Sequence, residues 1–178
     1  VAQEQRRRSE MDAFTALMPL RVGDVVRVPL LLPHSLQHGV RTVEFQTPVY
    51  ERQILSFAQK VLTQDHWDTA DAADRMTLVA PPQEPFEQLV EQPDLRVERI
   101  VDFEDFEVVR ASLTGKASWV PPNAVCYALV MVVSGGLQLP AATLESEQAV
   151  LLPAGSGIAL EPAGDGAGAV ILVAYPRR

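Results

Sequence analysis

The chain has 178 residues, a net charge of -8 at pH 7 and one cysteine, Cys126. This length supports a buried core without cross-links, and a single cysteine excludes an intramolecular disulfide, which fits a reducing compartment. No apolar run reaches the roughly 20 residues that cross a bilayer, and the acidic stretch 61–110 is unlike a nucleic-acid surface. We therefore expect a cytoplasmic protein with no membrane and no nucleic-acid partner.

The first 80 residues combine one expected helix with short apolar runs. Residues 2–18 have a charged start followed by apolar positions, which predicts a helix that ends at Pro19. Short runs rich in Val and Leu then alternate with Pro, Gly and polar breaks, which is typical of strands. Residues 54–62 fit either a strand or a helix. The strands expected here are Val25–Val28, Val40–Phe45 and Thr77–Val79.

The remainder of the chain has an all-β pattern. Four prolines interrupt residues 81–95, so we expect a linker there, with neither a regular helix nor a central strand. Beyond it, many short strands with Gly and Pro turns and no helices between them indicate a barrel or sandwich. The expected strands are Val97–Val101, Phe106–Leu113, Tyr127–Val133, Leu137–Leu139, Ala149–Leu152, Ile158–Leu160 and Ala169–Ala174.

A faint internal repeat links the two parts. The stretch GDVVRVPLLLPH (23–34) aligns with EQAVLLPAGSGI (147–158), and two related barrels would explain the match. The spacing of Gly23, Pro29 and His34 resembles the motif of cupin barrels, in which a glycine and a proline precede a metal-binding histidine; Leu31 replaces the motif's inner glycine. Neutral imidazole at that position suits zinc or iron.

The following residues extend this resemblance to one family. PHSLQHGVRTVEFQTPVYER (33–52) is similar to type I mannose-6-phosphate isomerases, although His38 and one extra residue precede the Gly39 turn. The resemblance implies that His34 is a ligand of Zn2+ or another divalent metal, Glu44 the active-site carboxylate, and Arg52 a catalytic and substrate-binding cation. It also implies a sugar phosphate as partner, with isomerisation of mannose 6-phosphate to fructose 6-phosphate through a cis-enediol.

The expected fold class is all-β, with cupin (jelly-roll) barrels and a short N-terminal helix. Residues 1–80 would form part of a metal-binding barrel, 81–95 a Pro-rich linker, and 96–178 a complete barrel without metal, since Ile158 stands where its histidine would be. The family's other metal ligands, a Gln-x-His pair and a distant glutamate, precede the matched region. We therefore expect either a C-terminal fragment, inactive alone, or a cupin that has lost its metal.

Each candidate residue has a structural alternative. His34 is a lone histidine after a proline, Glu44 fits a solvent-facing strand position, and Arg52 could pair with Glu51 at the surface. The run QDHWDT, with Asp65, His66, Trp67 and Asp68, resembles a metal cluster in composition, but a loop tied by hydrogen bonds is the simpler interpretation.

Two other functions stay open. The chain could be a non-catalytic cupin that binds a sugar or sugar phosphate, or a structural barrel that forms a homodimer. Trp119, Tyr127 and Tyr175 are expected to be core or interface aromatics rather than platforms for sugar stacking.

Overall fold

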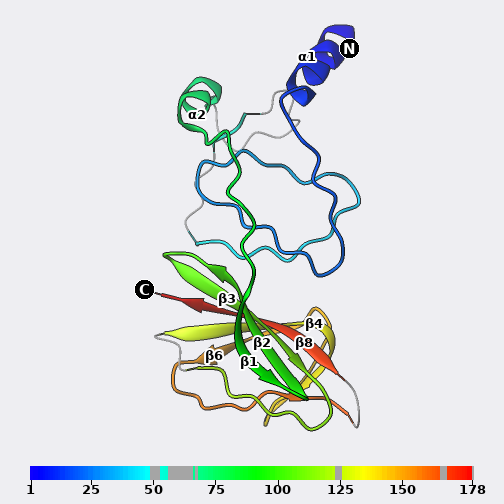
Figure 1. Cartoon of the computed structure of the whole chain (residues 1–178), viewed down its shortest axis with the longest axis vertical. Helices are drawn as coiled ribbons and strands as arrows, with labels where there is room; N and C mark the ends of the chain where they lie inside the picture. Colours follow the sequence, from blue (N-terminus) through cyan, green and yellow to red (C-terminus); the bar gives the residue numbers. More distant parts are fainter. Residues whose placement is uncertain (49–52, 56–65, 67, 123–125, 165–167, 178) are drawn as a thin grey trace. The chain divides into compact units, whose positions relative to one another are not determined.

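The computed structural model describes residues 1–48, 53–55, 66, 68–122, 126–164 and 168–177. The chain divides into two compact units, of which one contains residues 1–42 and 49–82 and the other residues 43–48 and 83–178. Figure 1 shows that the strands of the described residues all belong to the second unit. No helix in the described residues is long and apolar enough to span a membrane.

The described part of the N-terminal unit contains two helices, α1 (Ala2–Asp12) and α2 (Thr69–Arg75). Helix α1 is stabilised by ion pairs on its surface, such as that between Arg8 and Glu4 at 3.0 Å. It ends at Asp12, well before Pro19. The hydroxyl of Thr15 donates a hydrogen bond to the carbonyl of Asp12, which would otherwise lack a partner within the helix. The helix expected over residues 2–18 is therefore confirmed only in its first part.

The strands expected at Val25–Val28, Val40–Phe45 and Thr77–Val79 are wrong. The described residues before Glu87 contain no strand, and most apolar side chains of these runs are exposed. A strand requires a second row of backbone donors and acceptors as well as an apolar pattern. The described residues of this unit provide no such row, so the pattern alone does not produce a sheet.

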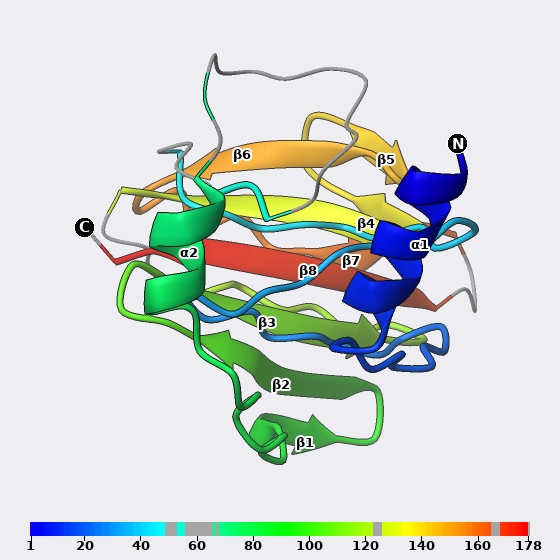
Figure 2. The same ribbon diagram turned by 90° about the horizontal axis from the view of Figure 1, so that it is seen from above.

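The C-terminal unit is an antiparallel all-β structure, so the expected all-β class is confirmed. Its main sheet has the order β1-β2-β3-β8-β4-β6, which Figure 2 shows face on, and the far end of β4 also pairs with β5 and β7. The last strand thus lies between the third and the fourth, as in a jelly roll of the cupin type. The strands are β1 (Glu87–Gln92), β2 (Leu95–Asp102), β3 (Phe106–Leu113), β4 (Tyr127–Gln138), β5 (Thr143–Glu145), β6 (Ala149–Pro153), β7 (Glu161–Pro162) and β8 (Ala169–Pro176).

The alternation of the central strands builds the core. In β3 and β8, Val109 is paired with Val173 and Ala111 with Ile171, and all four are buried in one apolar cluster. Trp119 and Tyr175 belong to the same cluster, which confirms them as core aromatics. Side chains at every second position of paired strands meet on one face of the sheet, so these rows define the barrel interior.

Several elements differ from the expected boundaries. The strand expected at Ile158–Leu160 is wrong, since only Leu160 makes an isolated bridge, to Trp119, and the short strands β5 and β7 lie where none was expected. Strand β1 lies within the expected linker 81–95, but it is an edge strand flanked by Pro85 and Pro93, which is compatible with the proline positions. Strand β4 joins the two strands expected at 127–133 and 137–139. A register shift between Val132 and Ser134 and a φ of 77° at Gly135 let the strand pass through its Ser-Gly-Gly segment.

Candidate functional site

The first turn of the internal repeat has the same hydrogen bonds in both copies. The amide of Asp24 donates to the carbonyl of Arg21 at 3.1 Å, and the amide of Gln148 donates to the carbonyl of Glu145 at 3.1 Å. In return, the amide of Arg21 donates to the Asp24 carboxylate at 2.8 Å, and the amide of Glu145 to the Gln148 side-chain oxygen at 2.9 Å. An aspartate and a glutamine thus close the same turn.

The backbone dihedrals match as well. Gly23 and Glu147, at one position of the repeat, have φ values of 94° and 73°. Eight residues later, Leu31 and Gly155 have φ values of 64° and 67°. Leu31 and Glu147 are the non-glycine residues with positive φ among those the structure describes, a conformation that costs free energy for any L side chain. At these two positions, each copy therefore has one glycine and one strained residue.

The second turn completes the correspondence. The amide of Leu32 donates to the carbonyl of Pro29 at 3.3 Å, and that of Ser156 to the carbonyl of Pro153 at 3.2 Å. Residues 21–32 therefore share both turns with residues 145–156 of the barrel, although only the second copy lies in a sheet. The next position differs, because Gly157 has a φ of 60° whereas the ring of its counterpart Pro33 fixes φ near about −65°. In this correspondence His34 occupies the position of Ile158.

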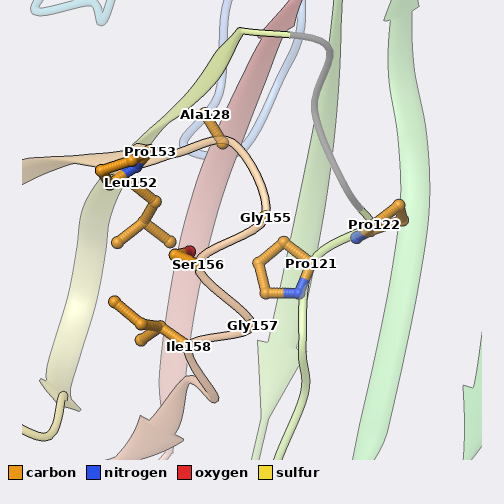
Figure 3. Close-up of a pocket in the computed structure, with 9 residues that line it drawn as sticks. All are labelled: Pro121, Pro122, Ala128, Leu152, Pro153, Gly155, Ser156, Gly157 and Ile158. Carbon is orange, nitrogen blue, oxygen red and sulfur yellow. The ribbon is translucent and has the colours of Figure 1, made fainter.

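In the C-terminal barrel, the position aligned with His34 lines a small cavity. Ile158 lines a cavity of about 20 Å³ together with Leu152, Ala128 and Pro121, as Figure 3 shows. This volume is enough for about one water molecule. The residues that line it include no titratable side chain, so it does not have the composition of a metal site.

His34 itself has one ring nitrogen engaged. Its side chain is exposed, and Nδ1 lies 2.9 Å from the carbonyl oxygen of Leu32. A carbonyl only accepts hydrogen bonds, so Nδ1 must carry the proton, and in the neutral ring Nε2 keeps its lone pair. Metal-binding histidines typically have this arrangement, in which a backbone carbonyl fixes the tautomer and orients the ring.

The described structure does not bring the three predicted site residues together. Glu44 is exposed and belongs to residues 43–48, which are part of the C-terminal unit, whereas His34 belongs to the N-terminal unit. Arg52 lies outside the described residues. Among the described residues, no group of three or more His, Cys, Asp and Glu could hold a metal ion. A catalytic zinc takes three protein ligands, so the described residues supply one suitable ligand but not a complete site.

The QDHWDT segment has hydrogen bonds of a structural kind in its described part. The Asp68 carboxylate accepts from the amide of Ile54 at 3.2 Å, and its other oxygen lies 3.5 Å from Nε2 of His66. Asp65 and Trp67 lie outside the described residues. The described contacts fit a loop tied by hydrogen bonds.

Sequence reasoning missed a polar cluster at one end of the barrel. Glu107 Oε2 lies 3.2 Å from Nε of Arg99 and 3.1 Å from a guanidinium nitrogen of Arg177, which also contacts Asp102. Tyr175 is paired with Glu107 across β3 and β8, and its buried hydroxyl has no hydrogen-bond partner among the described residues. Burial, and secondly the charge of Glu107, raise the pKa of Tyr175. The glutamate at an inward position of β3 was the signal for this cluster.

The structure thus defines an antiparallel all-β C-terminal unit, and the N-terminal unit repeats two of its turns. No protein-family model matches the chain, and no curated protein matches it significantly. Similar solved structures include KdgF from Halomonas sp., which is 18% identical with a TM-score of 0.41 over 52% of this chain and 89% of that chain. The polyketide cyclase RemF from Streptomyces resistomycificus is 20% identical, with a TM-score of 0.43 over 58% of this chain and 81% of that one.

A third similar structure is a cupin_2 domain of an XRE family transcriptional regulator from Enterobacter cloacae. It is 18% identical, with a TM-score of 0.41 over 48% of this chain and 99% of the domain. These likenesses are distant and cover about half of the chain. The fold assignment therefore rests on the strand order and the strand pairing described above.

Proposed function

We propose that the chain is part of a two-barrel cupin that isomerises a sugar phosphate, with His34 as a ligand of a divalent metal such as Zn2+. The observation that supports this proposal is the pair of turns that residues 21–32 share with residues 145–156. In the C-terminal copy, Ile158 lines a small cavity, and the alignment of the repeat gives His34 the same position in the N-terminal copy. That residue is a histidine whose Nδ1 is held by a carbonyl and whose Nε2 lone pair is left for a ligand.

The proposed reaction needs few protein groups. An aldose and a ketose interconvert when a base moves a proton between neighbouring carbons, and a nearby positive charge stabilises the enediol oxygen that forms. We assign the base to Glu44 and the charge to Arg52, on the likeness to type I mannose-6-phosphate isomerases. Because the described residues supply a single metal ligand, the metal requires ligands beyond them, and no step is assigned to it.

The test uses the whole protein with two matched variants. His34→Ala and His38→Ala each remove one exposed imidazole, and only three residues lie between them. We expect His34→Ala to lower zinc affinity at least about 10-fold, and to lower the turnover of mannose 6-phosphate with it, because it deletes a ligand. His38→Ala should retain both. Unchanged metal content in His34→Ala would refute the site.

One observation favours a second candidate, a cupin that binds a sugar phosphate without catalysis. The cavity at Ile158 is small and is lined by no titratable side chain, and the described residues contain no group of three metal ligands. The sequence that precedes Val1 distinguishes the two candidates: a Gln-x-His followed by a glutamate supports the enzyme, and its absence supports the binder. Calorimetry with mannose 6-phosphate gives the same decision, since the binder shows heat of binding without turnover.

A further inference from the structure

Charge is unevenly distributed over the main sheet. Strands β4, β6 and β8 contain no Asp, Glu, Lys or Arg, whereas β1, β2 and β3 each contain several, and the chain as a whole carries a charge of -8. On the uncharged half, Leu129 of β4 is 40% exposed and Leu151 of β6, its direct partner across the strands, is 52% exposed. An exposed apolar pair on an uncharged surface is a feature of interaction sites.

Strand β6 also has an unused edge. Two printed contacts fix the direction of its backbone groups: Val132 donates to the carbonyl of Gln148, and Ala154 donates to the carbonyl of Cys126. In an antiparallel ladder the bonded positions alternate, so even-numbered residues of β6 bond to β4 and odd-numbered residues point away. The amides and carbonyls of Ala149 and Leu151 therefore point to the outer edge, where no described residue pairs with them. Figure 2 shows β6 at this margin of the sheet.

The opposite edge of the sheet is protected. Strand β1 carries Glu87 and Glu91, has an irregular register between Gln88 and Val90, and is followed by Pro93. Charges, bulges and prolines are the devices that prevent edge strands from pairing with other chains. Strand β6 lacks charges and bulges, and Pro153 stands only at its end. The two edges of one sheet thus differ in the way expected if only the β6 edge has a partner.

We propose that the β6 edge binds the β6 edge of a second copy of this chain, in an antiparallel homodimer with its two-fold axis at Val150. In this register Ala149 of each copy faces Leu151 of the other. The amides of Ala149 and Leu151 in each copy donate hydrogen bonds to carbonyls of the other copy. Pro153, which has no N–H, stays outside the paired region. Two acidic chains repel one another, so they associate best where neither is charged, and this edge meets that condition.

The test is the mass of the whole chain in solution, measured by light scattering after size exclusion and by sedimentation velocity. Leu151→Lys puts a charge on the edge, and Ala149→Pro removes an outward N–H without taking a bond from the β4 ladder. Leu89→Lys is the matched control, because it makes the same change at the 40%-exposed Leu89 of the opposite edge strand. Circular dichroism confirms that each variant is folded.

We expect the wild type and Leu89→Lys to have twice the chain mass of 19.5 kDa, and both β6 variants to have the mass of one chain. Ala149→Pro decides the matter if Leu151→Lys fails to fold. A wild type that stays at one chain mass at high concentration overturns the proposal, because the edge is then unpaired or is covered by the chain's own residues. A dimer that survives both β6 changes overturns it too. The proposal does not depend on the metal site, so either can fail alone.

Discussion

The left-handed residue of the second turn offers a direct test of whether the two copies of the repeat share the same turns. Gly155 has a φ of 67°, and a Cβ built on it meets no atom within 4 Å. Gly155→Ala should therefore cost only the conformational penalty of a left-handed alanine, about 1–2 kcal/mol. For a domain of roughly 100 residues, this corresponds to a fall of about 4–15 °C in melting temperature. Gly168→Ala, at a glycine without positive φ, is the control and should cost less.

The reverse change at the equivalent position should act in the opposite direction. Leu31→Gly removes the conformational penalty of a left-handed leucine. Glycine also gives the unfolded chain more conformational freedom, which lowers stability by a smaller amount. We therefore expect the free energy of unfolding to rise by up to about 1 kcal/mol. The amide of Thr77 donates to the carbonyl of Leu31 at 2.8 Å, so its hydrogen exchange reports on this turn.

The assay for Gly155→Ala is urea unfolding followed by the fluorescence of Trp119, which is buried and bridged to Leu160 in the C-terminal barrel. A Trp67→Phe background isolates this signal. Gly155→Ala with unchanged stability, or Leu31→Gly with faster exchange at Thr77, would show that the two turns do not share a strained conformation in solution. The assignment of His34 by equivalence with Ile158 would then fail.

Two further predictions concern buried polar groups of the barrel. Tyr175→Phe should raise stability by about 1 kcal/mol in urea unfolding, because it removes a buried hydroxyl that has no described partner. Since the pKa of Tyr175 is raised in the folded state, the wild type should also lose stability as pH rises above the ordinary tyrosine value of about 10, and Tyr175→Phe should lose less; equal pH profiles would contradict this. Arg110→Ala should cost about 2–3 kcal/mol, because Glu98, which is 8% exposed, loses a partner at 2.9 Å. Arg96→Ala removes the more exposed partner of the same carboxylate and should cost clearly less, and a larger loss there would refute the ranking.

The strands of the C-terminal barrel could be predicted because their pattern is local. Strand β3 begins and ends at the expected residues, and the alternation of β8 marks its buried face directly. Strand β1 could not be predicted, because both of its faces are mainly polar and its pairing with β2 decides its conformation. A break between strands was expected at residues 134–136, but β4 continues through them by means of a bulge, which sequence pattern alone does not reveal.

The N-terminal half shows the converse limit. Gly23 and Pro29 predicted the turns of a cupin hairpin, and the turns are present, since they depend on residues within a few positions of one another. The sheet around them is absent from the described residues, because pairing requires distant strands. The left-handed Leu31 was not predictable from its residue type. The roles of Glu44 and Arg52 remain predictions for the same reason, because they depend on long-range placement.

The central claim is that His34 is held by a carbonyl at Nδ1 and presents Nε2 to a metal. Nitrogen-15 NMR of the imidazole rings, with and without zinc, measures this directly in the whole protein. We predict that neutral His34 is the Nδ1–H tautomer and that zinc shifts its Nε2 resonance, while His38 is unaffected. An Nε2–H tautomer for His34, or an Nε2 resonance that zinc leaves unchanged, would contradict the claim.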